Sequence, residues 1–99
     1  MIDPNRGTGR TTRSLKRVPD GGYFILRSMR MADYCRGILF HLGRDPKSVQ
    51  FVPLTRSEIS LRGRSEAFEV DHHCYDPPHS RVEMQSIDWL HAFDEGRTS

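Results

Sequence analysis

The sequence predicts a small α/β domain: a mostly parallel sheet with helices on both faces, in three layers. Short apolar runs that suit buried strands alternate along the chain with segments that show helical spacing. Parallel strands need such helical crossovers, because a tight turn cannot join them. The chain has 99 residues, and we expect one domain over 1–99.

The first element is a basic loop and helix at 5–18, where three residues fall at helical spacing: Thr11, Leu15 and Val18. The breaker run 19–22 ends this helix. The apolar run 23–26 is typical of a buried parallel strand. Ser28 can cap the next helix, an amphipathic one over 31–42 that Gly43 ends.

The second half begins with a buried strand at 49–54. Residues 58–61 alternate polar and apolar, which favours a short strand or an extended connector. A firmer strand at 67–71 ends in Asp71. The capping-box pattern of Ser80–Glu83 opens the last helix, with Gly96 as its expected stop. We expect a broad apolar stripe on this helix: Val82, Met84, Ile87, Trp89, Leu90 and Phe93.

Composition limits the classes of partner. The net charge is only +2, too weak to indicate nucleic-acid binding, although basic residues gather before position 18. At 35% hydrophobic residues the core is thin, which leaves a homo-oligomer open. Cys35 and Cys74 occur without a signal-peptide pattern or an apolar run that could span a membrane, so we expect free thiols, a cytoplasmic location and no membrane contact.

The stretch Asn5–Arg13 combines two glycines, which allow a tight turn, with a run that can open a helix and attract an anion to its N-terminus. Gly9, Arg10 and Thr11 occupy the last three fixed positions of the phosphate-binding pattern G-x-x-x-x-G-K-[ST]. Pro4 stands at its first glycine, and arginine replaces its lysine.

This Gly-Thr-Gly-Arg-Thr-Thr form resembles a variant found in small P-loop nucleotide-binding proteins, many of them encoded by phages. The resemblance implies that the protein binds a nucleoside phosphate together with Mg²⁺. By this resemblance Arg10 is the phosphate clamp and Thr11 the hydroxyl that faces Mg²⁺. The phosphate-binding residues it implies are Gly7, Thr8, Gly9, Arg10, Thr11 and Thr12.

Asp71 provides a matching second motif, because a P-loop fold places a carboxylate at the end of a buried strand as a hard-oxygen partner for Mg²⁺. The fold departs from the family at its start, since only residues 1–4 precede the loop and Pro4 cannot continue a central strand. Either this is a trimmed P-loop protein whose sheet closes differently, or the loop only mimics the motif.

A second group of residues follows Asp71. Four side chains there could share zinc or another transition metal: His72, His73, Cys74 and His79. The alternative is a polar exit from the strand. Under the nucleotide interpretation, His72 and His73 are also the candidate catalytic residues, able to orient a water or contact the terminal phosphate.

The sequence therefore predicts a nucleotide-binding protein and leaves open the base specificity and whether the nucleotide is hydrolysed. The alternative is a non-enzymatic accessory protein whose basic N-terminal arm, up to Arg17, contacts nucleic acid or a protein partner. The two hypotheses differ on deletion of that segment. It would leave the fold intact if the segment is an arm and would destabilise it if the segment is part of a P-loop domain.

Overall fold

The computed structural model describes residues 9–64 and 66–98 and contains a parallel three-stranded sheet. The strands are β1 (Tyr23–Leu26), β2 (Gln50–Pro53) and β3 (Phe68–Val70). Their spatial order is β2-β1-β3, so β1 is central. Ile25 is in register with Val52 on one side and Val70 on the other.

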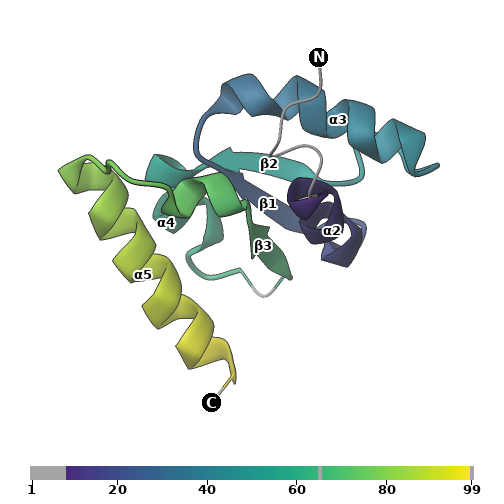
Figure 1. The fold of residues 1–99 in the computed structure, drawn as a ribbon. Helices are drawn as coiled ribbons and strands as arrows, with labels where there is room; N and C mark the ends of the chain where they lie inside the picture. The colour runs from purple at the N-terminus through teal and green to yellow at the C-terminus, as the bar shows by residue number, and fades with distance from the viewer. Residues whose placement is uncertain (1–8, 65, 99) are drawn as a thin grey trace.

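Helices cover both faces of this sheet (Figure 1). They are α2 (Arg10–Arg17), α3 (Ala32–His41), α4 (Ser57–Leu61) and α5 (Arg81–Thr98). Three short 3₁₀ segments lie between them: η1 (Met29–Met31), η2 (Leu54–Arg56) and η3 (His72–Tyr75). Helices α2 and α3 lie on one face of the sheet, and α4 and α5 lie on the other (Figure 1).

The central strand β1 supplies both halves of the core. Phe24 and Leu26 pack with the buried side chains of α2 and α3, while Tyr23 and Ile25 pack with those beneath α4 and α5. All four β1 side chains are buried. A strand covered on both faces needs apolar residues at every position, which is why 23–26 is a continuous apolar run rather than an alternating one.

Several local predictions are confirmed. The helices and strands expected around 11–18, 23–26, 31–42, 49–54 and 67–71 are all present, within one or two residues of their expected ends. Ser28 caps η1 by accepting from the backbone N–H of Arg30. Gly43 has a φ of 77°, the left-handed value that ends α3.

The strand or connector predicted at 58–61 is wrong, because this segment is the helix α4. Ser57 and Leu61, four positions apart, face inward, whereas Ile59 is 83% exposed. The polar–apolar alternation had placed Ile59 and Leu61 on the same face. In this five-residue segment, burying Ser57 and Leu61 on one face of a helix determines the conformation, and the alternation does not.

The last helix begins as expected but differs in its end and in the width of its buried face. Its capping box forms as predicted: the backbone N–H of Ser80 donates to Glu83 Oε1 at 2.8 Å, and that of Glu83 donates to Ser80 Oγ at 3.1 Å. However, Gly96 does not end α5, which continues to Thr98. Val82 and Met84 are 53% and 56% exposed, so the buried stripe is narrower than predicted.

No helix within the described ranges is both long enough and apolar enough to cross a membrane.

Candidate functional site

Asp71 places a carboxyl group in the protein core. It follows β3 directly, and its backbone N–H donates to the carbonyl oxygen of Ile25 at 2.9 Å, which continues the sheet pairing. Its side chain is 1% exposed. Burying a carboxyl group is unfavourable unless it has hydrogen-bond partners, so the groups around Asp71 are decisive.

The first partner is Thr11, in the first turn of α2. Thr11 Oγ1 donates to Asp71 Oδ1 at 2.9 Å, a buried bond between residues 60 positions apart. Gly9 immediately precedes α2 with a φ of 66°, a conformation that glycine adopts without strain. The structure thus places side by side the hydroxyl and the carboxylate that the sequence assigned to Mg²⁺.

The N-terminus of α2 has an unusual charge pattern. Its first turn holds no acidic residue, and Gly9 provides no side-chain cap. Arg10 lies in that turn with its side chain exposed. A cation at the positive end of a helix dipole is unfavourable, and a bound anion would reverse this. Thr12 is half-buried in the same turn.

Two further residues of the predicted phosphate loop, Gly7 and Thr8, lie outside the described residues. The prediction that no strand precedes the loop concerns residues 1–4, which also lie outside them.

The two histidines after Asp71 both face its carboxylate. His73 Nδ1 lies 2.9 Å from Asp71 Oδ2, at hydrogen-bond distance. His72 Nδ1 lies 3.4 Å from Asp71 Oδ1 without hydrogen-bond geometry, and the His72 side chain is 11% exposed. The pKa of His72 is lowered, mainly because burial disfavours the charged imidazolium. The Asp71 carboxylate acts in the opposite direction, and the Arg10 cation adds to the lowering.

The other two members of the predicted zinc set have different partners. Cys74 is buried, its thiol contacts the carbonyl oxygen of Ile25, and burial raises its pKa to about 12. His79 Nε2 lies 2.8 Å from the carbonyl oxygen of Cys74. The group brought together is instead Asp71, His72 and His73, with one ligand atom from each lying within 4.8 Å of the others.

Arg27 holds this segment in place, and the sequence analysis missed it. It directly follows β1, and its guanidinium donates to the carbonyl oxygens of three residues: His73, Asp76 and Pro78. It also donates from Nε to Glu83 Oε2 at 3.0 Å. One cation therefore fixes both the 72–78 segment and the start of α5. A basic residue immediately after a buried strand was the available signal.

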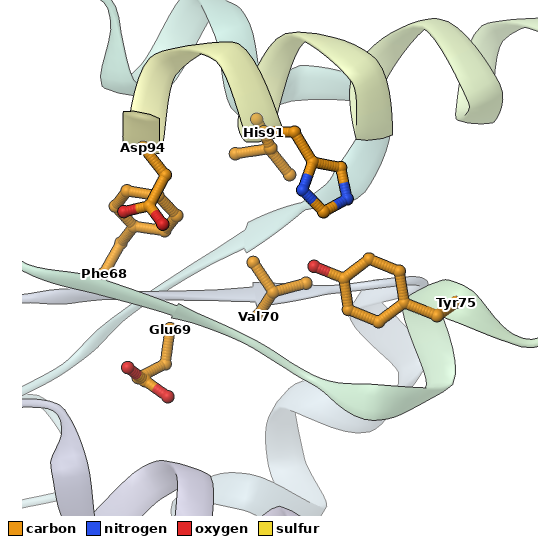
Figure 2. Close-up of a pocket in the computed structure, with 7 residues that line it drawn as sticks. Phe68, Glu69, Val70, Tyr75, His91 and Asp94 are labelled. Atoms are coloured by element: carbon orange, nitrogen blue, oxygen red, sulfur yellow. The ribbon is translucent and has the colours of Figure 1, made fainter. Parts of the chain in front are cut away.

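A separate pocket of about 260 Å³ lies between β3 and α5 (Figure 2). Its lining residues are Phe68, Glu69, Val70, Tyr75, Leu90, His91 and Asp94. Among the described residues, its lining includes none of the predicted phosphate-binding residues and no Lys or Arg. Glu69 points away from α5, toward α2 (Figure 2), where Arg17 Nε donates to it at 3.0 Å. This pocket is not suited to a phosphate.

Comparison of the chain with family models, with curated proteins and with solved structures gave no match.

Proposed function

We propose that this protein binds the phosphate groups of a nucleotide at the N-terminus of α2, with Mg²⁺ held between Thr11 and Asp71. The observation that carries the proposal is the 2.9 Å contact between Thr11 Oγ1 and Asp71 Oδ1. Mg²⁺ prefers oxygen ligands such as carboxylates, together with phosphate oxygens and water. The two side chains therefore fit the ion that the phosphate-loop resemblance implies.

Charge supports the same location for the phosphate. The first turn of α2 combines the backbone N–H groups of a helix start, which have no partner within the helix itself, with an exposed Arg10 and no acidic side chain. An arginine guanidinium binds phosphate oxygens in pairs and keeps its charge at any physiological pH. Arg10 would neutralise phosphate from the solvent side, while the backbone of Gly9 allows close approach.

The Mg²⁺ ion would neutralise charge on the phosphates and orient them. Thr11 and Asp71 position it from elements that the core holds rigidly. His72 faces the same Asp71 oxygen, Oδ1, that accepts from Thr11, and His73 faces Oδ2, so both remain the candidates for orienting a water. The proposal concerns binding and does not require that the nucleotide be cleaved.

The alternative of a detachable basic arm is less favoured, because one face of α2 is part of the core. Leu15 is fully buried, and Val18 just after the helix is 1% exposed. Arg17 forms an ion pair with Glu69 on β3. A segment with these contacts cannot be removed without exposing the face of the sheet that it covers.

Isothermal titration tests the proposal. Wild-type protein would be titrated with ATP, GTP and ADP, each with and without Mg²⁺. We expect binding that Mg²⁺ strengthens. The variant Arg10→Ala should bind about tenfold more weakly, as expected for loss of a charge-assisted hydrogen bond. The exposed Arg30 on η1 offers the matched control Arg30→Ala, which should bind like wild type. Absence of binding by wild type at millimolar nucleotide would rule the function out.

A further inference from the structure

We propose that Asp71, His72 and His73 form a binding site for a first-row transition-metal ion such as Zn²⁺, a ligand class different from the Mg²⁺ of the proposed nucleotide site. The inference does not rest on nucleotide binding, because it requires only these three side chains and the metal. Asp71 is also the carboxylate assigned to Mg²⁺, so the two ions would compete for it, and the metal is titrated without nucleotide.

The spacing of the donor atoms suits one ion. Zinc binds imidazole nitrogen and carboxylate oxygen at about 2.0–2.2 Å, so two ligands at a tetrahedral angle are about 3.3–3.5 Å apart. His72 Nδ1 lies 3.4 Å from Asp71 Oδ1, which is within this range. His73 Nδ1 lies 2.9 Å from Asp71 Oδ2, a hydrogen-bond distance that would lengthen by about 0.5 Å when both atoms bind one ion. All three residues offer donors within 4.8 Å of one another.

The two ring nitrogens of His72 give the most direct support for a bound metal ion. Both of its ring nitrogens are buried, and neither has a hydrogen-bond partner in the described part of the chain. A neutral imidazole carries one donor and one acceptor, and leaving both unpaired inside a protein is unfavourable. A metal ion bound at one nitrogen would satisfy the acceptor and explain why the ring stays buried against Asp71.

The backbone holds the three residues in place. The N–H of Cys74 donates to the carbonyl oxygen of Asp71 at 3.0 Å, which closes the turn that begins η3. Arg27 binds the carbonyl oxygen of His73 from the other side. The rings of His72 and His73 lie 4.0 Å apart, tilted by 37°. This arrangement orients both rings toward one carboxylate before any ion arrives.

The chemistry of the donors selects the ion. Imidazole suits zinc, copper, iron and nickel, whereas Mg²⁺ prefers an all-oxygen shell. Two histidines and one carboxylate supply three ligands, so a four-coordinate ion would keep its fourth position for a water or another ligand. Metal binding at His73 Nδ1 would replace its hydrogen bond to Asp71, and the neutral imidazole would then carry its proton on Nε2.

The experiment uses the untagged full chain, stripped of metal with a chelator and dialysed. Titration with Co²⁺ is followed by visible absorption, and titration with Zn²⁺ and with Mg²⁺ by calorimetry. We expect one Zn²⁺ per chain, a Co²⁺ spectrum of nitrogen–oxygen coordination, and Zn²⁺ affinity far above that for Mg²⁺. His72→Ala and His73→Ala should each weaken Zn²⁺ binding about tenfold or more.

Matched variants separate this site from other imidazoles and thiols. His41→Ala and His91→Ala remove exposed histidines on α3 and α5 and should leave Zn²⁺ affinity unchanged. His79→Ala and Cys74→Ala test the wider ligand set suggested by the sequence, and both should retain binding. Circular dichroism confirms that each variant is folded.

Absence of stoichiometric Zn²⁺ binding, or equal affinity in wild type and the folded His72→Ala/His73→Ala double variant, would overturn the inference. Loss of binding in Cys74→Ala but not in His73→Ala would also overturn it. If Zn²⁺ binds and nucleotide does not, the metal site stands and the proposed function fails. If Mg²⁺-nucleotide binds and Zn²⁺ does not, the reverse holds.

Discussion

Arg27 Nε donates to Glu83 Oε2 at 3.0 Å, and this contact joins the end of β1 to the first turn of α5. The side chains of Arg27 and Glu83 are 27% and 18% exposed, so the ion pair is partly shielded from water. The same arginine also binds the backbone of the segment that follows the histidines. One side chain therefore links the start of α5 to the geometry beside Asp71.

Replacing Arg27 should destabilise the protein measurably. Arg27→Ala removes hydrogen bonds to a carboxylate and to three backbone carbonyl oxygens, for an expected loss of about 1.5–3 kcal/mol in the free energy of unfolding. Urea denaturation measures it. The control Arg62→Ala breaks an exposed pair with Glu58 and should change stability by less than about 0.5 kcal/mol. Equal losses in the two variants would contradict the role assigned to Arg27.

Glu83 should make stability depend on pH in the acid range. The backbone N–H of Ser80 and the Arg27 guanidinium lower the pKa of Glu83 from 4.5 to about 2. Because the folded-state pKa is the lower one, the contribution of Glu83 is complete above pH 4.5 and is lost as pH falls toward 2. Urea midpoints of wild type and Glu83→Gln should differ at pH 6 and converge on acidification. A constant difference across this range would contradict the prediction.

Helix α2 should prove essential to the fold. Leu15→Ala removes a fully buried side chain and should lower the free energy of unfolding by about 2–5 kcal/mol. Lys16→Ala, on the exposed face of the same helix, should have an effect within about 0.5 kcal/mol. Urea denaturation compares the two. A negligible effect of Leu15→Ala would favour the detachable-arm hypothesis.

The two cysteines should be unreactive in the native state. Both are free and buried, and burial raises the pKa of each thiol to about 12. Thiolate is the reactive form, so alkylation at pH 8 should be negligible in native protein and complete for both residues after denaturation. Mass spectrometry after iodoacetamide treatment counts the modified thiols. Alkylation of the native protein as fast as that of a solvent-exposed cysteine would contradict the structure.

The sequence predicted the fold well where apolar periodicity was strong. β1 lies between two covered faces, so every residue of 23–26 had to be apolar and the pattern was unmistakable. Segment 58–61 was misassigned because a single helical turn shows only one buried pair. Val82 and Met84 are apolar yet exposed, because the inward side of α5 is the one that holds Glu83, Ser86, Ile87 and Leu90 at helical spacing. Two of those residues are polar, so apolar residues alone did not identify that side.

The candidate site was predictable in part. Thr11 and Asp71 were identified separately, each by its place at a helix start or a strand end, and the structure brings them into contact. The grouping of Asp71 with His72 and His73, rather than with Cys74 and His79, depends on how the η3 turn orients consecutive side chains. The role of Arg27 depends on contacts 46 or more positions away, which spacing does not reveal.

The hydroxyl of Thr11 provides the most direct test of the central claim. Thr11→Ser keeps the oxygen that Mg²⁺ would need, and Thr11→Val keeps the shape without it. Calorimetric titration of both variants with Mg²⁺-ATP, after circular dichroism shows them folded, is the decisive measurement. We predict near wild-type affinity for Thr11→Ser. For Thr11→Val we predict binding about tenfold weaker and less dependent on Mg²⁺, because Asp71 alone is left to hold the ion. Wild-type affinity and Mg²⁺ dependence in Thr11→Val would contradict the account.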